Sequence, residues 1–166
     1  MGSPCFCCDA MLGGLARWLR FAGFDVTLPE CAEARERAAM ARAEERWLLT
    51  RDRELAAGAG PRVLCIQALT IPEQIAEVCR RLDLRAEPRR FFTRCSRCNG
   101  RLAPIDPERA RSLVPPYVGT HCSEFVQCGG CGQVYWPGSH HARIRARLEA
   151  SFPTRSVDGG EDDGEA

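Results

Sequence analysis

The sequence predicts an α/β fold in three layers, with a parallel sheet between helices, followed by a small cysteine-rich unit. Over residues 1–88, short apolar runs alternate with helical patterns, which is typical of parallel strands joined by helices. From Phe91 the helical periodicity fades, and two Cys-x-x-Cys pairs appear. Because helices normally cover both faces of a parallel sheet, these observations favour a three-layer domain with a separate C-terminal unit.

Each predicted strand is a short run of apolar residues that ends at a polar residue or a turn. The first run is followed by Asp9 and the third by the segment Arg51–Asp52. The four strands are predicted at residues 4–8, 24–28, 46–50 and 62–66.

The helices show a different periodicity. Leu12, Leu15, Leu19 and Ala22 share one face of a predicted helix that ends at Gly23. Two more helices are predicted from an Ala-, Glu- and Arg-rich composition and from capping-box spacing, at residues 32–45 and 70–82. A short arginine-rich helix is predicted at residues 141–150.

We expect the chain to divide into three segments: an α/β domain at 1–88, a cysteine-rich unit with a closing helix at 89–150, and an acidic tail at 151–166. From Val157 onward the tail holds five acidic residues and no basic ones. It has too few apolar side chains to bury, so it is predicted to be disordered.

The overall composition is that of an ordinary globular protein, with 45% hydrophobic and 27% charged residues. No apolar run is long enough to span a bilayer, and the first residues lack the features of a signal peptide. We therefore expect a cytoplasmic protein with no membrane partner. In that reducing compartment, eleven cysteines favour metal ligands and buried thiols over disulfides. The sequence leaves the oligomeric state open.

The basic residues are all arginine and are unevenly distributed. Residues 80–111 hold ten arginines against four acids. Such a segment is a plausible electrostatic footprint for RNA, but a solvated arginine-rich face accounts for the charge equally well.

The two Cys-x-x-Cys pairs are the strongest single signal for a bound metal. Two thiolates three positions apart can hold one side of a tetrahedral zinc ion, and a second pair closes the site. Four cysteines leave no open coordination position, so this zinc is expected to be structural. The alternative is a redox-active dithiol. The predicted ligands are Cys95, Cys98, Cys128 and Cys131.

The segment "PCFCCDAML" at residues 4–12 holds three further cysteines. On a strand, Cys7 and Cys8 point to opposite faces, so they are poorly placed to bind one metal together. Free cysteine behaves as a small hydrophobic residue, which suits a strand covered on both sides. We expect the cysteines to form the strand and the strand to position Asp9.

Two acidic residues follow neighbouring predicted strands. Asp9 follows the first strand and Asp52 the third, and each directly precedes a helix. Either residue alone is well explained as a helix N-cap. Together they are expected to meet in the crevice at the carboxyl ends of the strands, where a divalent cation such as Mg²⁺ or Mn²⁺ would relieve their repulsion. Such an ion can activate water against a phosphodiester.

Four blocks of the chain resemble one known family. They are "DAMLGGLARWLRFAGFD" at 9–25, "RWLLTRDREL" at 46–55, "RCSRCNGRL" at 94–102 and "FVQCGGCGQVYWPGSHHARI" at 125–144. The family is the PIN-like ribonuclease domain with a C-terminal zinc ribbon, known from the C-terminus of the mutator-seven exonuclease. The resemblance implies a PIN-like fold and a metal-dependent ribonuclease that cleaves RNA by attack of water on phosphorus.

The resemblance also implies site residues. Asp9 matches the first acid of the family and Asp52 the acid of its "TRD" motif. Relatives often carry an aspartate pair before the second helix. This chain has "PECAEARERAAM" there, so Glu33 is the nearest candidate for the third catalytic acid, with Glu30 and Glu36 as alternatives.

Arginines near these blocks are candidates for RNA contact. Arg17 and Arg20 lie three positions apart in the block "LARWLR" and are candidates to bind phosphates, with surface ion pairing as the alternative. Five arginines beside the cysteine pairs are expected to contact the RNA backbone: Arg89, Arg90, Arg94, Arg97 and Arg101. If the acidic site is incomplete, the alternative function is a non-catalytic RNA-binding protein.

Overall fold

The computed structural model describes residues 3–29 and 33–153, and its core is a four-stranded parallel sheet. The strand order is β2-β1-β3-β4, so β1 and β3 lie at the centre. The strands fall within one residue of their predicted positions: β1 (Cys5–Cys8), β2 (Asp25–Thr27), β3 (Trp47–Thr50) and β4 (Val63–Cys65).

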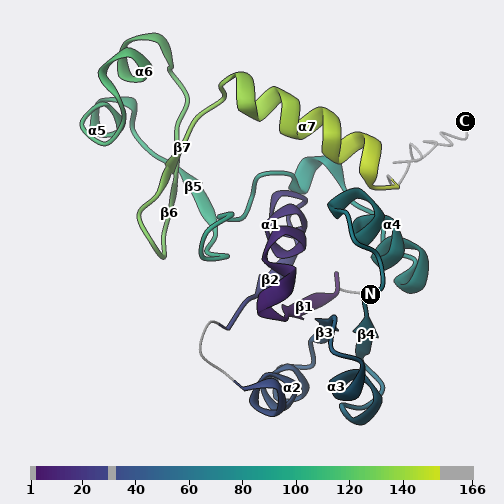
Figure 1. Ribbon diagram of the computed structural model, residues 1–166. Coiled ribbons are helices and arrows are strands. Elements are labelled where there is room, and N and C mark those ends of the chain that lie inside the picture. The colour runs from purple at the N-terminus through teal and green to yellow at the C-terminus, as the bar shows by residue number, and fades with distance from the viewer. Residues whose placement is uncertain (1–2, 30–32, 154–166) are drawn as a thin grey trace, which may run out of the picture.

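Helices cover both faces of this sheet, which confirms the predicted three-layer fold (Figure 1). One face packs against α1 (Gly13–Phe21) and α4 (Ile71–Leu82), and the other against α2 (Ala34–Ala43) and α3 (Arg53–Gly58). A short 3-10 turn, η1 (Ala10–Leu12), joins β1 to α1, and a second, η2 (Pro88–Arg90), follows α4.

Alternation along β1 explains its cysteines. Phe6 and Cys8 face the core beneath α1 and α4, whereas Cys7 faces the core beneath α2 and α3. Burial raises the pKa of both Cys7 and Cys8, which keeps them as neutral thiols. These cysteines therefore pack as small hydrophobic residues, as the sequence predicted.

The chain order across the sheet creates a switch point between β1 and β3. From β1 the chain passes through α1 to β2 on one side, then through α2 to β3 on the other side of β1. The connecting helices therefore leave in opposite directions at the carboxyl ends of β1 and β3. Open parallel sheets usually bind ligands at such a point.

The cysteine-rich unit is built on a small antiparallel sheet of order β5-β6-β7. Its strands are β5 (Leu102–Pro104), β6 (Val126–Cys128) and β7 (Val134–Tyr135). Two helices that the sequence did not predict, α5 (Pro107–Arg111) and α6 (Pro116–His121), lie between β5 and β6. They are too short to show a helical period, and they cover a small core of Ala110, Phe125 and Val134.

The closing helix α7 (Ser139–Ser151) packs against the α/β domain. Leu148 and the following Phe152 are buried in the core beneath α1 and α4. The backbone N–H of Ala86 donates to the carbonyl of Pro153 at 3.0 Å. Residues 151–153 therefore belong to the fold, which corrects the prediction that the tail begins at 151. The rest of the predicted tail, residues 154–166, lies outside the described residues.

Within residues 3–29 and 33–153, no helix is both long and apolar enough to cross a membrane.

Candidate functional site

A chain of hydrogen bonds links the two aspartates at the switch point. Thr50, the last residue of β3, donates from Oγ1 to Asp9 Oδ2 at 2.9 Å. The same oxygen accepts a hydrogen bond from the backbone N–H of Asp52 at 3.0 Å. The backbone N–H of Asp9 in turn donates to the carbonyl of Leu49 on β3 at 2.9 Å. The ends of β1 and β3 are thus joined through both backbone and side chains.

Both aspartates also cap the elements that follow them. Asp9 Oδ1 accepts a hydrogen bond from the N–H of Met11, and Asp52 Oδ1 accepts from the N–H groups of Glu54 and Leu55. Capping and ligand binding are compatible, because each carboxylate oxygen can accept more than one contact. Asp9 is only 5% exposed and Asp52 is exposed, so the site has a buried and an open side.

The candidates for a third acid lie on and around the start of α2 and α3. Glu33 is the N-cap residue of α2, and its backbone N–H donates to Glu36 Oε2 at 2.9 Å. Glu54 is exposed on the first turn of α3. Glu30 lies outside the described residues. In the described part of the chain, neither Glu33 nor another acid forms a group with Asp9 and Asp52 in which all ligand atoms lie within 4.8 Å of one another.

Two carboxylates that follow adjacent strands at a switch point suit a hard divalent cation, for which carboxylate oxygens are the preferred protein ligands. Asp9 and Asp52 fit that requirement by chemistry, and each follows the carboxyl end of a central strand. The identity of a third protein ligand stays a prediction, with Glu33 as the nearest candidate by sequence.

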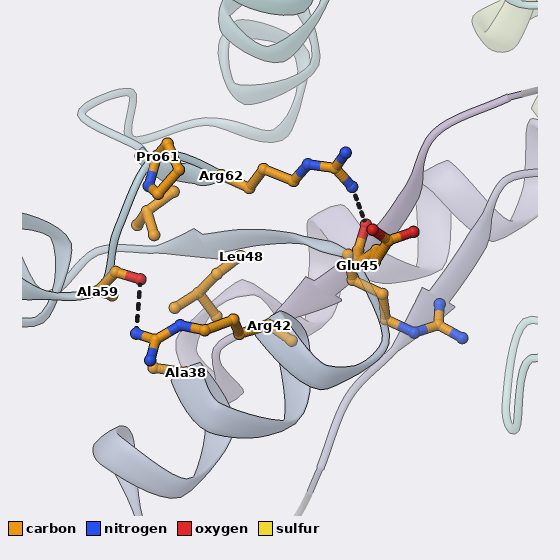
Figure 2. A pocket seen from close by; sticks show the side chains of 10 residues that line it. Ala38, Arg42, Glu45, Leu48, Ala59, Pro61 and Arg62 are labelled. Atoms are coloured by element: carbon orange, nitrogen blue, oxygen red, sulfur yellow. Dashed lines mark hydrogen bonds between the residues drawn. The ribbon is translucent and has the colours of Figure 1, made fainter. Parts of the chain in front are cut away.

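A separate cavity of about 330 Å³ lies on the face of the sheet covered by α2 and α3 (Figure 2). Arg42 closes one side by donating to the carbonyl of Ala59 at 3.2 Å, and Arg62 the other by donating to the carbonyl of Glu45 at 2.6 Å. Leu48 forms part of its lining. The cavity contains neither Asp9 nor Asp52, so it is distinct from the site at the switch point.

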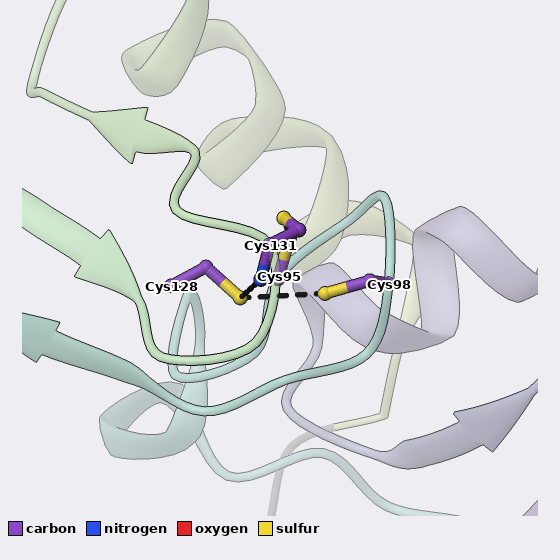
Figure 3. Close-up of side chains that lie close together, drawn as sticks. All are labelled: Cys95, Cys98, Cys128 and Cys131. Carbon is purple, nitrogen blue, oxygen red and sulfur yellow. Dashed lines mark hydrogen bonds between the residues drawn. The ribbon is translucent and has the colours of Figure 1, made fainter. Parts of the chain in front are cut away.

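The two Cys-x-x-Cys pairs converge on one point (Figure 3). The sulfur atoms of Cys95, Cys98, Cys128 and Cys131 all lie within 4.8 Å of one another. Cys95 and Cys131 are 3.6 Å apart, and Cys98 and Cys128 are 3.3 Å apart. Both distances are too long for a disulfide and close to the roughly 3.8 Å expected between sulfurs that share a tetrahedral zinc ion. The cluster therefore fits a four-cysteine zinc site.

The pKa shifts of two of these thiols are also consistent with binding of a cation. Burial opposes ionisation of Cys95, but hydrogen bonds from the Tyr135 hydroxyl and from the N–H groups of Cys98 and Arg97 lower its pKa to about 6. Burial and the neighbouring thiols raise the pKa of Cys98 to about 12. Such opposite shifts reflect the cost of placing negative charges side by side, a cost that a bound divalent cation removes.

The first cysteine pair is docked on the edge strand β2. The backbone N–H of Val26 donates to Asn99 Oδ1 at 2.9 Å, and the carbonyl of Val26 accepts from Arg20 Nε at 2.9 Å. Arg20 Nη1 also donates to the carbonyls of Ser96 and Arg97, at 3.2 and 2.9 Å. Side chains thus satisfy the backbone of an edge strand that would otherwise be open to pairing.

These contacts change the interpretation of Arg20. Its side chain is 5% exposed and is engaged by three backbone carbonyls, so it holds the two domains together rather than facing a phosphate. Arg17, one turn earlier on α1, is exposed and lies 5.5 Å from the centre of the Phe21 ring. Of the two candidates, only Arg17 is placed to contact a ligand.

Asp25, at the start of β2, forms a second set of contacts between β2 and the ribbon unit. It forms ion pairs with Arg46 at 2.6 Å and Arg94 at 2.7 Å, and accepts a hydrogen bond from Asn99 Nδ2 at 2.9 Å. Burial opposes ionisation, but the bonds from Arg46 and Asn99 and the charge of Arg94 outweigh it and lower the pKa of Asp25. Arg94, one of the five arginines predicted to contact RNA, is therefore engaged within the protein.

Three residues of these networks had no functional role in the sequence-based interpretation: Thr50, Asp25 and Asn99. Thr50 is the first residue of the "TRD" motif, so the motif could have indicated a role for it. Asn99 has a positive φ of 70° directly after the Cys-x-x-Cys turn, where asparagine is favoured. Asp25 has no comparable signal, because its partners come from positions 46, 94 and 99.

Residues 4–148 of the chain match the family model of the Mut7-C RNase domain. Comparisons with curated proteins and with solved structures give no match.

Proposed function

The chain belongs to the Mut7-C RNase domain family, and on that basis we propose that it is a ribonuclease that hydrolyses RNA phosphodiester bonds with the help of Mg²⁺ or Mn²⁺. The family indicates the ribonuclease and hence RNA as substrate. The metal dependence and the residues that carry the reaction are our proposal.

The observation that carries the proposal is the Asp9–Thr50–Asp52 arrangement at the switch point of the sheet. The ion would be held by carboxylate oxygens of Asp9 and Asp52, with Glu33 proposed as a third ligand. When bound, Mg²⁺ or Mn²⁺ supplies an activated water and neutralises charge on the phosphate.

The chain's own residues would prepare this site. Thr50 fixes the orientation of the Asp9 carboxylate through Oδ2, while the Met11 N–H fixes it through Oδ1. Burial of Asp9 excludes water from one side, whereas exposed Asp52 leaves the other side open to an RNA strand. Arg17 is proposed to bind a phosphate of that strand.

We further propose that the four-cysteine cluster holds structural zinc. It would keep the ribbon folded and docked on β2, and so assist RNA binding at a distance from the carboxylates. The redox alternative is disfavoured, because the four sulfurs form one cluster rather than two independent pairs. The free cysteines of the described chain support a reducing location, which we take to be the cytoplasm.

The proposal is tested by incubating the purified protein with a labelled generic RNA with and without Mg²⁺ or Mn²⁺. Cleavage should require the ion, and Asp9→Asn and Asp52→Asn should each abolish it while leaving the thermal unfolding temperature near that of the wild type. Undiminished cleavage by Asp9→Asn would rule out the proposed site. Glu33→Gln tests the third ligand, with Glu108→Gln, exposed on α5 of the ribbon unit, as its control.

The second candidate function is a non-catalytic RNA-binding protein. It is favoured by one observation, the lack of a third acid grouped with Asp9 and Asp52 among the described residues. Retention of RNA with no cleavage in either metal would support this function instead.

A further inference from the structure

A groove of about 790 Å³ lies between the zinc-ribbon unit and the α/β domain. One side is formed by β5 to β7 and the segment after β7, and the other by α1, the first turns of α7 and Phe92. Its lining includes none of the four cluster cysteines, although Ser96, next to Cys95, is part of it. The lining also includes neither Asp9 nor Asp52. It is therefore a site of its own.

Aromatic rings line much of this groove. Phe21 and Phe92 come from the α/β side, and Tyr135 and Trp136 from the ribbon side. His141 lies against Phe92, with ring centres 4.0 Å apart and an interplanar angle of 37°. Phe92, Tyr135, Trp136 and His141 are half-buried, so their rings are partly open to the groove.

The charged groups at this groove are mainly basic. Arg17 is exposed at its edge, over Phe21. Arg94 also lines the groove, but it forms an ion pair with Asp25 at 2.7 Å. Arg145, which is not a lining residue, lies 5.4 Å from the centre of the Phe92 ring and pairs with Glu149 at 3.8 Å. Among the lining residues that the structure describes, Glu124 is the acidic one. The combination of aromatic faces and exposed arginine is the one that proteins use to bind single-stranded nucleic acid.

We propose that this groove binds a single-stranded segment of the RNA substrate, with bases against the aromatic rings and a phosphate at Arg17. This inference rests on the proposed function for the identity of the ligand. A duplex is not expected to bind in the same way, because its bases are stacked on each other and their faces are closed to side chains. An acidic peptide is the alternative ligand, because its carboxylates would also be attracted to Arg17.

Helix α1 connects the groove to the proposed catalytic site. It begins at Gly13, directly after η1 and Asp9, and carries Arg17 on its second turn. Arg17 is therefore displaced from Gly13 by about 6 Å along the helix axis. A strand bound in the groove and following α1 would reach the carboxyl ends of β1 and β3, so cleavage should require a minimum length of single-stranded RNA.

The first test measures binding in a chelator-free buffer with no added Mg²⁺ or Mn²⁺, so that turnover is not supported and the proposed zinc stays in place. The probes are a fluorescently labelled 12-nucleotide single-stranded RNA and a duplex of the same sequence. Arg17→Ala, His141→Ala and Trp136→Leu should each weaken single-strand binding by roughly fivefold or more. The Trp136→Leu variant keeps an apolar side chain against the small ribbon core. The matched control is Arg80→Ala, an exposed arginine on α4 outside the groove, which should bind as the wild type does.

Two features of the data separate this site from general electrostatic attraction. The slope of log affinity against log salt concentration should fall by about 0.7 for Arg17→Ala, whereas it should stay unchanged for Trp136→Leu. With a cleavable RNA and Mg²⁺, the groove variants should raise KM with little change in kcat. Equal loss of affinity in Arg80→Ala would overturn the proposal.

The second test is photocrosslinking of RNA that carries 5-iodouridine, followed by mass spectrometry. Crosslinks are expected in peptides that contain Trp136, His141 or Phe92. Crosslinks confined to other peptides, or an acidic peptide that binds at least as tightly as the RNA and displaces it, would overturn the inference. Binding and crosslinking do not depend on turnover, so loss of cleavage in Asp9→Asn with intact crosslinks would separate the groove from the catalytic site.

Discussion

Thr50 Oγ1 donates a 2.9 Å hydrogen bond to Asp9 Oδ2, and this contact joins the carboxyl ends of the two central strands. Because the same Thr50 oxygen accepts from the N–H of Asp52, one buried hydroxyl sets the relative positions of both aspartates.

Replacing Thr50 by valine should therefore disturb the site while leaving the side-chain volume almost unchanged. Thr50→Val leaves a buried carboxylate oxygen and a backbone N–H without this partner, at a cost of about 1–3 kcal/mol in the free energy of unfolding. We expect RNA cleavage to fall by at least about tenfold through misplacement of Asp9. Thr50→Ser keeps the hydroxyl and should retain most activity. Steady-state cleavage and urea unfolding measure the two effects, and equal activity of the valine and serine variants would contradict this role.

Arg20 should matter for stability more than for substrate binding. Arg20→Met keeps the aliphatic packing but removes donors to the carbonyls of Val26, Ser96 and Arg97. We expect a loss of about 2–4 kcal/mol in the free energy of unfolding, measured with urea. Arg17→Met, on an exposed position of the same helix, should cost less than about 0.5 kcal/mol. A similar small loss for both variants would argue against the docking role of Arg20.

Asp25 should make the stability of the protein depend on pH in the acidic range. Its pKa is lowered in the folded state from an ordinary value of 3.8, so its carboxylate stabilises the fold above that pH. This contribution is lost as the pH falls through the folded-state pKa. Urea unfolding between pH 3 and pH 7 should show the wild type more stable than Asp25→Asn near neutrality, and the difference should shrink below about pH 4. A difference that stays constant with pH would exclude this explanation.

The four-cysteine cluster should hold one zinc ion per chain. Cys128→Ser should abolish stoichiometric zinc binding, measured by elemental analysis, and lower the unfolding temperature by about 10 °C or more. Cys122→Ser is the matched control, because Cys122 lies in the ribbon unit but outside the cluster. Zinc content unchanged in Cys128→Ser, or lost equally in Cys122→Ser, would show that the ligands are wrongly assigned.

Gly100 should be required at its position beside the cluster. A Cβ atom there would lie 2.7 Å from Cys128 Sγ, which is closer than packed atoms allow, and 3.4 Å from Cys98 Sγ. Gly100→Ala should therefore weaken zinc retention against a chelator by at least about tenfold. Gly129→Ala is the control, since its added Cβ would meet nothing within 4 Å. Equal chelator resistance of both variants would contradict the proposed crowding.

The elements with a clear pattern of apolar residues or a clear capping motif were predictable from the sequence. Strand β3, a run of apolar residues ending at Thr50, and helix α4, with its capping box at Thr70 and Glu73, lie within one or two residues of their predicted bounds. Helices α5 and α6 were not predicted, because helices of five and six residues are held by the ribbon core rather than by their own periodicity.

The sequence by itself determined the parallel three-layer sheet, the pairing of two Cys-x-x-Cys turns and the placement of Asp9 and Asp52 at one edge. Each of these follows from local spacing or from the direction of parallel strands. Only the tertiary structure decided that Arg20 binds backbone carbonyls of the ribbon, that Thr50 links the aspartates, and that Glu33 is the N-cap of α2. Those outcomes depend on partners far apart in the chain, and the position of a side chain on a helix face does not reveal which distant backbone it will meet.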